Sequence, residues 1–229
     1  MYTSEQIAGM IDHTNLKAFS TQEDLEKLCA EAKTHGFKSV AVNGAAIAWC
    51  RKALEGSGVL IDTTVGFPLG QMTIAAKAAE AEDAIREGAQ EFDYVINVGR
   101  ARMHDWSYIE DEMTQLVAVA RKAGVCVKVI FENCYLEKEE IAELSRIAAR
   151  VKPDFIKTST GFGTGGAAVE DVRIMKENGG PDLKVKAAGG IRTWKAAEAM
   201  IQAGASRIGT SAGIAILEEL KKSAEADGC

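Results

Sequence analysis

The chain has 229 residues, of which 47% are hydrophobic and only three are proline, so it can bury a large aliphatic core and has little room for a disordered segment. Its formal net charge of -6 argues against nucleic acid or an anionic membrane surface as a partner. The five cysteines form no C-x-x-C pair, no stretch approaches the roughly 20 apolar residues of a membrane helix, and the first ten residues do not resemble a signal peptide. We therefore expect a cytoplasmic protein.

Short β-branched runs alternate along the chain with longer segments that are rich in alanine and charge. The predicted strands cover residues 9–14, 37–43, 59–67, 91–97, 125–131, 153–159, 183–188 and 206–211. Helical patterns over 20–36, 73–88, 107–124 and 137–151 lie between them. Ser20 is expected to cap the first helix with Glu23, and a glycine follows each of several helices where a left-handed residue is favoured: Gly36, Gly88, Gly124 and Gly204.

The spacing of these strands predicts the fold class. Strands begin every 20 to 35 residues, and a parallel strand pair needs a crossover of a dozen residues or more, usually a helix. Eight such units predict an α/β fold in which a single (β/α)8 TIM barrel forms one catalytic domain over residues 1–229. An open doubly wound sheet is the alternative that also fits the alternation.

Charged residues interrupt five of the predicted strands, where the barrel wall should be apolar: Asp12, Asp93, Lys128, Lys157 and Lys186. None of them stands at a predicted strand tip, and both faces of such a strand are mostly dry. A buried unpaired charge is costly, so these groups should compensate one another. We expect Lys128 and Asp12 to form one supporting pair, while Glu132 could contact a substrate hydroxyl or relay a proton.

Lys157 and Lys186 are the most informative of these residues. They lie 29 positions apart, one strand-helix unit, which places them on neighbouring strands at similar heights. Two adjacent ammonium groups disfavour double protonation, so the pKa of one should fall, and a neutral amine can attack a carbonyl to form a Schiff base. Asp93 can balance the second cation and pass protons, or it can serve as a structural partner only.

Glycine-rich turns end the last three predicted strands, as GFGTGG (161–166), AGGIR (188–192) and GTSAG (209–213). Such turns let backbone N–H groups converge on an anion, and barrels often bind phosphate after strands seven and eight. Arg192 and Ser211 could add donors. GFGTGG also fits G-x-G-x-x-G, but the acidic residue of a dinucleotide site does not follow it. The three histidines are scattered, so we expect no metal site.

Several motifs together resemble the deoxyribose-phosphate aldolases, a family of class I, Schiff-base aldolases. They run nearly end to end, as IDHTNLK (11–17), VGFPLG (65–70), EFDYVINVG (91–99), VKVIFENC (127–134), FIKTSTGF (155–162), VKAAGGIR (185–192) and RIGTS (207–211). The resemblance implies that Lys157 is the nucleophile, Lys186 the ammonium that perturbs it and Asp93 the proton-relay partner. It also implies substrate and phosphate contacts at Thr14, Thr158, Gly161, Gly189, Gly190, Arg192, Gly209 and Ser211.

The implied activity is reversible cleavage of 2-deoxy-D-ribose 5-phosphate to acetaldehyde and D-glyceraldehyde 3-phosphate in deoxyribonucleoside catabolism, with no metal or organic cofactor and with a homodimer as one possible assembly. Another phosphosugar barrel, such as an isomerase or a transaldolase-like enzyme, and a catalytically silent binding barrel are the alternatives. Ala41 replaces a cysteine and Gly44 a proline of the family pattern, which puts the aldehyde pocket in question. Tyr135 is the last tyrosine before Cys229, so no tail phenol is expected at the site.

Overall fold

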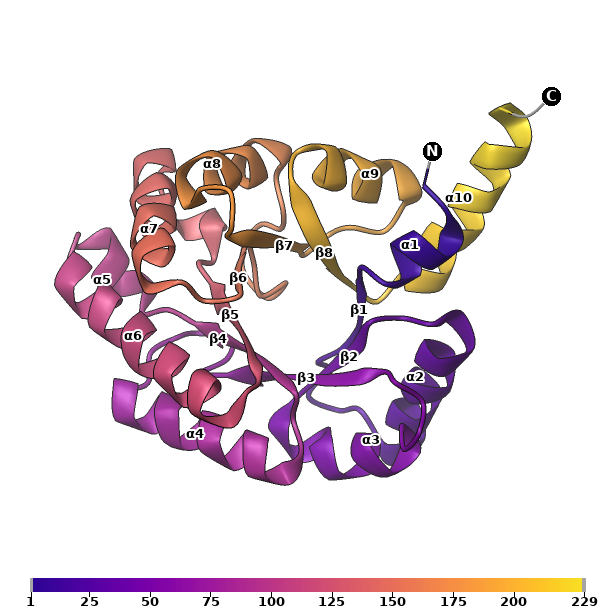
Figure 1. Cartoon of the computed structure of the whole chain (residues 1–229), viewed down its shortest axis with the longest axis horizontal. Coiled ribbons are helices and arrows are strands. Elements are labelled where there is room, and N and C mark those ends of the chain that lie inside the picture. Colours follow the sequence, from indigo (N-terminus) through magenta and orange to yellow (C-terminus); the bar gives the residue numbers. More distant parts are fainter. Residues whose placement is uncertain (1, 228–229) are drawn as a thin grey trace.

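A closed ring of eight parallel strands forms the centre of the computed structural model, which describes residues 2–227 (Figure 1). The strands are β1 (Ile11–Asn15), β2 (Ser39–Val42), β3 (Leu60–Val65), β4 (Glu91–Val95), β5 (Cys126–Ile130), β6 (Phe155–Lys157), β7 (Lys184–Ala188) and β8 (Ala205–Thr210). Each pairs with the next, and β8 pairs with β1. The predicted barrel is therefore confirmed, and the open sheet is wrong. Cys229 lies outside the described residues.

Helices surround the strands as an outer ring (Figure 1). They are α1 (Ser4–Ala8), α2 (Gln22–His35), α3 (Ile47–Ala53), α4 (Ile74–Glu87), α5 (Val98–Arg102), α6 (Trp106–Ala123), α7 (Lys138–Val151), α8 (Val169–Gly179), α9 (Trp194–Gln202) and α10 (Gly213–Asp227), with short 3-10 turns η1 (Gly44–Ala46) and η2 (Asn133–Tyr135). The four helices expected from the sequence correspond to α2, α4, α6 and α7. Within residues 2–227, no helix combines the length and the apolar character needed to cross a membrane. The division into one domain over 1–229 stays a prediction.

Helix ends follow the local sequence, with one shift of register. Gly36 and Gly124 adopt left-handed backbone at the ends of α2 and α6, as expected for residues without a Cβ. The cap of α2, however, is Thr21 paired with Asp24, so the predicted Ser20–Glu23 box is wrong by one residue. Ser20 instead donates a hydrogen bond to Asn15 at 2.7 Å, which draws its hydroxyl toward the end of β1.

Side-chain alternation along the strands separates an apolar layer from a charged one. The strand residues that pack into the hydrophobic core between barrel and helices include Phe92, Tyr94, Val127, Val129, Ile156, Val185 and Ala187. The residues between them point the other way, into the barrel, because successive side chains of a strand alternate in direction. These inward residues include the charged ones of the sequence pattern. The fold thus collects the unusual polar groups on the barrel axis.

Candidate active site

Eight charged side chains fill the lower part of the barrel, and none is more than 5% exposed. Four are acidic and four are basic: Asp12, Asp62, Glu91, Asp93, Lys128, Lys157, Lys186 and Arg207. With every group ionised their formal charges cancel. A compensated set of this kind can stay buried, whereas any one of these charges alone would be expensive.

The two lysines singled out by spacing lie side by side. Lys157 and Lys186 face each other in the register of β6 and β7. Both ammonium nitrogens contact the same atom, Asp93 Oδ2, at 2.6 Å from Lys157 and 2.7 Å from Lys186. The predicted juxtaposition of these three residues is present in the structure. Lys157 is the last residue of β6, however, so the expectation that it lies away from a strand tip is wrong.

The surroundings separate the two lysines by protonation state. Burial and the neighbouring Lys186 ammonium lower the pKa of Lys157, although the carboxylate of Asp93 opposes them. Burial also acts to lower the pKa of Lys186, but the carboxylates of Asp12, Asp62 and Asp93 outweigh it and raise that pKa. Lys157 is therefore the amine that loses its proton more easily, and Lys186 stays a cation.

The expected pair between Lys128 and Asp12 is wrong, because other partners are closer to each. Lys128 Nζ lies 3.0 Å from Asp62, 2.8 Å from Glu91 and 2.9 Å from Asp93. Asp12 contacts Lys186 at 2.6 Å and Arg207 at 2.7 Å through different oxygens. Both residues do belong to the charged cluster, as supporting positions should.

Sequence reasoning missed three members of this cluster: Asp62, Glu91 and Arg207. Asp62 and Arg207 lie inside predicted strands and Glu91 begins one, so a charge in an otherwise apolar barrel wall is the signal that points to them. The oxygens of Asp12, Asp62 and Glu91 come within 4.8 Å of one another, a spacing that a metal ion could use. In this barrel the cations beside them come from the chain itself, as Lys128, Lys186 and Arg207.

A cavity of about 450 Å³ opens above the charged cluster at the carboxyl ends of the strands. Lys157 and Asp93 form part of its floor, with Thr64 beside Asp93 in the strand register. Six of the glycine-turn residues expected at a phosphate site line the same cavity: Gly161, Gly189, Gly190, Arg192, Gly209 and Ser211. The barrel thus brings the lysine and the glycine-rich turns to one opening.

Two hydroxyls that the resemblance placed near a substrate have different surroundings. Thr14 lines the cavity and donates a hydrogen bond to the Asp12 carbonyl at 2.8 Å. Thr158 is fully buried, and its hydroxyl lies 3.1 Å from both the carbonyl oxygen and the amide nitrogen of Ala188. Thr158 therefore ties the end of β6 to the end of β7.

Glu132 is held by the chain itself. Its φ of 57° is unusual for a residue with a Cβ. One carboxylate oxygen accepts the Thr160 N–H at 3.0 Å, and the other accepts the Thr160 hydroxyl. Glu132 thus fixes the turn that carries Gly161. It lines a separate cavity, with Pro68 and Tyr135, from the one that contains Lys157, and its contact with a substrate hydroxyl stays a prediction.

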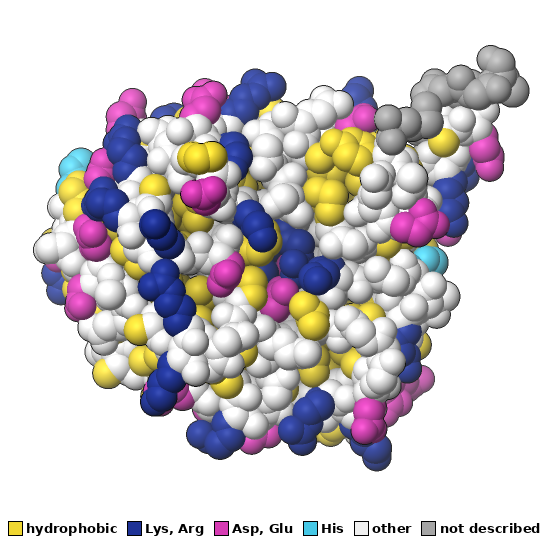
Figure 2. Space-filling view, viewed as in Figure 1, with side chains coloured by type: hydrophobic (Ala, Val, Ile, Leu, Met, Phe, Trp, Pro, Cys, Tyr) yellow, Lys and Arg dark blue, Asp and Glu magenta, His cyan; other side chains and the backbone are white. Residues whose placement is uncertain are grey.

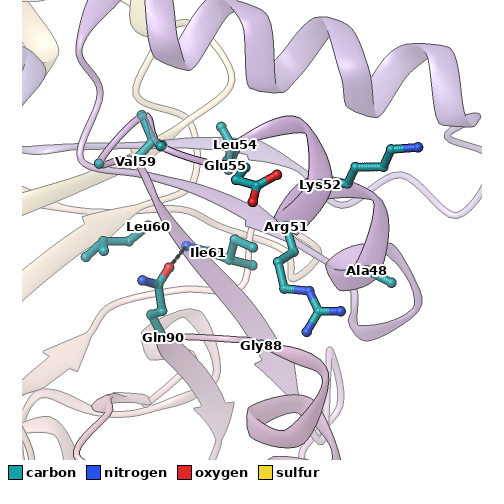
Figure 3. A pocket seen from close by; sticks show the side chains of 12 residues that line it. Ala48, Arg51, Lys52, Leu54, Glu55, Val59, Leu60, Ile61, Gly88 and Gln90 are labelled. Atoms are coloured by element: carbon teal, nitrogen blue, oxygen red, sulfur yellow. Dashed lines mark hydrogen bonds between the residues drawn. The ribbon is translucent and has the colours of Figure 1, made fainter.

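A larger cavity, of about 740 Å³, lies at the opposite ends of the strands (Figure 3). The side chains of Arg51, Lys52 and Glu55 at its rim are exposed, and Gln90 accepts a hydrogen bond from the Ile61 N–H at 3.1 Å. Its charged groups are therefore hydrated. By volume alone this cavity would be the candidate active site. The smaller cavity is the better candidate, because it contains Lys157, whose pKa is lowered.

The surface shows charges of both signs. Figure 2 shows acidic and basic side chains interspersed over one face, with several Lys and Arg side chains gathered near its centre. On this face neither sign of charge covers a continuous area. Recognition of an anion therefore depends on a local site such as the cavity above the cluster.

Comparison with known proteins gives consistent matches over nearly the whole chain. Residues 7–219 match the family described as DeoC/LacD family aldolase. Deoxyribose-phosphate aldolases from Lactobacillus acidophilus and Bacteroides thetaiotaomicron are 51% and 53% identical, covering 96% and 95% of this chain and 93% of each relative. The solved structure described as the unique tetrameric structure of deoxyribose phosphate aldolase from Aeropyrum pernix is 32% identical, with a TM-score of 0.90, and covers 96% of this chain and 93% of that chain.

Proposed function

The chain belongs to the DeoC/LacD aldolase family, and on that premise we propose that it catalyses the reversible cleavage of 2-deoxy-D-ribose 5-phosphate to acetaldehyde and D-glyceraldehyde 3-phosphate. The observation that carries the proposal is the contact of two buried amines with one oxygen of Asp93. An isomerase has no need of that arrangement, whereas a Schiff-base aldolase needs a neutral amine beside a proton donor.

The first step uses the lowered pKa of Lys157. Its neutral Nζ attacks C1 of the open-chain aldehyde, and loss of water from the carbinolamine gives an iminium ion. The site favours this chemistry because Lys157 is at most 4% exposed but lines the cavity. Lys186 keeps its own proton and so does not compete as a nucleophile.

The second step breaks the C2–C3 bond. Its electron pair flows into the iminium, leaving an enamine on Lys157, and C3 becomes the aldehyde carbon of glyceraldehyde 3-phosphate as its hydroxyl loses a proton. Asp93 lies on the cavity floor and can take that proton. C2 of the enamine then accepts a proton supplied from Lys186 through Asp93, and hydrolysis releases acetaldehyde and free Lys157.

The glycine-rich turns bind the phosphate in this proposal. Gly189 and Gly190 both have φ values in the left-handed region, 91° and 78°, which point successive backbone groups in directions that other residues rarely allow. Arg192 and Ser211 stand exposed at the same opening. Binding the phosphate far from C1 holds the reacting carbon at Lys157 and lowers the entropic part of the barrier.

Reductive trapping tests the proposal. Borohydride added with deoxyribose 5-phosphate should attach the substrate to Lys157, located by peptide mass mapping, and Lys157→Met should abolish both the adduct and acetaldehyde release. Turnover without an adduct would favour an isomerase or another mechanism. Substrate binding without acetaldehyde release would favour the silent barrel.

The oligomeric state and the cellular location of the protein are part of the proposal. A homodimer stays a prediction, and one solved relative is described as tetrameric, so light scattering on the purified protein is the direct measurement. A cytoplasmic location likewise stays a prediction. It is supported by the odd number of cysteines, which lack a C-x-x-C pair, and by the soluble phosphosugar substrate.

A further inference from the structure

Asp62 is one of three acidic members of the cluster, with Asp12 and Glu91, to which the proposed mechanism assigns no role. It is fully buried on β3, two positions before Thr64, which lines the cavity. Its Oδ2 accepts a hydrogen bond from Lys186 at 2.8 Å, and its Oδ1 lies 3.0 Å from Lys128. Lys186 thus connects Asp62 to Asp93, because its ammonium group contacts both carboxylates.

The charge balance of the cluster limits where the proton that Lys157 loses can go. Lys157 must be neutral before it attacks, and a neutral Lys157 leaves the eight groups with one excess negative charge. Burial opposes an uncompensated charge, so the cluster favours a second, neutralising change within itself. One carboxylate must then hold the proton that Lys157 gives up.

The contacts single out Asp62 among the four carboxylates. Asp12 and Asp93 each contact a cation at 2.6 Å, and Glu91 makes a short contact with Arg207. Asp62 has longer contacts, at 2.8 and 3.0 Å, and shares both of its lysine partners, Lys186 and Lys128, with Asp93. Burial and the Asp93 carboxylate raise the pKa of Asp62 to about 6, whereas the neighbouring cations overcome burial and lower the pKa of Asp12 and Asp93.

We propose that Asp62 stores the proton that Lys157 loses and returns it, through Lys186 and Asp93, when the enamine is protonated. The transfer balances: Lys157 gives a proton to Asp93, Asp93 gives one to Lys186, and Lys186 gives one to Asp62. Lys157 ends neutral, Asp62 ends as the acid, and Asp93 and Lys186 are unchanged. Asp62 touches no substrate atom and acts through its neighbours, so it is a positioning residue.

Other groups in the barrel also influence Asp62 and have to be included in its titration. The charged and titratable ones are Asp12 on β1, Glu91 and Asp93 on β4, Cys126 and Lys128 on β5, Lys157 on β6, Lys186 on β7 and Arg207 on β8. Burial raises the pKa of Cys126 to about 12, and the pKa values of Lys128 and Arg207 are raised by their carboxylate neighbours against the effect of burial. Asp62 is the carboxyl group whose pKa these neighbours and burial together raise toward neutral pH.

The inference rests on the proposed function, and one experiment distinguishes the two. The rate at which cyanoborohydride and acetaldehyde modify Lys157 is measured from pH 5 to 9, beside turnover of deoxyribose 5-phosphate. In the wild type, the trapping rate should fall in two stages as the pH is lowered. The second stage, below about pH 6, should be the shallower one, because Asp62 then takes a proton and the loss of its charge favours the neutral amine of Lys157. In Asp62→Asn the stage near pH 6 should be missing.

The same variant should also separate trapping from turnover. Without the Asp62 charge, Lys157 loses its proton more easily, so trapping at pH 7 should equal or exceed that of the wild type. Turnover should fall by about tenfold, because enamine protonation no longer has a stored proton. Asp62→Glu should restore the stage near pH 6. Glu91→Gln, which removes a charge from the same cluster without contacting Lys157 or Lys186, should keep it.

Trapping and turnover that fall together in Asp62→Asn, or a stage near pH 6 that persists in it, would overturn the inference and leave Asp62 a structural residue. If that variant does not fold, the wild-type profile decides, because a single stage contradicts proton storage and two stages support it. Absence of any adduct on Lys157 in the wild type would refute the proposed function instead.

Discussion

Replacing Lys186 with methionine removes one charge beside Lys157 while keeping most of the side-chain volume. Both ammonium nitrogens touch Asp93 Oδ2, at 2.6 and 2.7 Å, so they are at most about 5 Å apart. At an effective dielectric constant of about 20, two unit charges at that distance repel by about 3 kcal/mol. This repulsion corresponds to about two pKa units on Lys157.

The direction of the effect follows from the loss of a like charge. Without the Lys186 cation the pKa of Lys157 rises, so the neutral amine is populated only at higher pH. In Lys186→Met, trapping of acetaldehyde on Lys157 at neutral pH should slow about 100-fold, and the acid side of its pH profile should move up by about two units. Imine formation should then recover at higher pH, while turnover stays low because the proton donor is gone.

A stability control is needed, because removing one partner of a buried ion pair costs about 3–5 kcal/mol. Lys77 on α4 provides it: its Nζ contacts Glu112 at 2.6 Å, and both side chains are fully buried outside the barrel. Lys77→Met should lower the free energy of unfolding by a similar amount and leave the pH profile of trapping in place. An unshifted profile in Lys186→Met would refute the electrostatic coupling between the two lysines.

Two further substitutions test other contacts. Glu132→Gln keeps an acceptor for the Thr160 N–H but loses the acceptor for its hydroxyl, so the KM for deoxyribose 5-phosphate should rise several-fold with kcat nearly kept; an unchanged KM would contradict the positioning of this turn. Burial lowers the pKa of His13 against the effect of its Glu31 partner, so the stability that it contributes is complete above its ordinary pKa of about 6.5 and is lost as the pH falls below it. Urea unfolding of His13→Gln should therefore show less loss of stability between pH 7 and pH 5 than the wild type, and equal losses would contradict this.

The barrel and the lysine pair could be predicted because both depend on spacing. Parallel strands need crossovers of fixed minimum length, and one strand-helix unit carries Lys157 to the same height as Lys186 on the next strand. Family motifs then added the roles of those residues. Strand register is thus the part of the site that a sequence specifies most directly.

Partners inside the cluster could not be predicted from spacing alone. Lys128 reaches Asp62, Glu91 and Asp93 because its flexible stem can choose among several carboxylates at similar distance. Asp62 also lies inside a predicted strand, but its position in the sequence does not indicate that it contacts Lys128 and Lys186. The left-handed backbone of Glu132 has no local sequence signal, since non-glycine residues rarely adopt it.

The buried charged cluster beneath Lys157 also determines the order in which the two products are released. Asp12, Lys128 and Lys186 have no exposed surface, so the products cannot leave through the charged cluster. Both fragments therefore leave through the cavity opening at the carboxyl ends of the strands. In the proposed binding mode the three-carbon fragment carries the phosphate, lies nearer the cavity opening and is free once the bond is cut, whereas the two-carbon fragment stays covalently bound to Lys157. Glyceraldehyde 3-phosphate should therefore leave first and acetaldehyde last, a sequence that product-inhibition patterns would reveal.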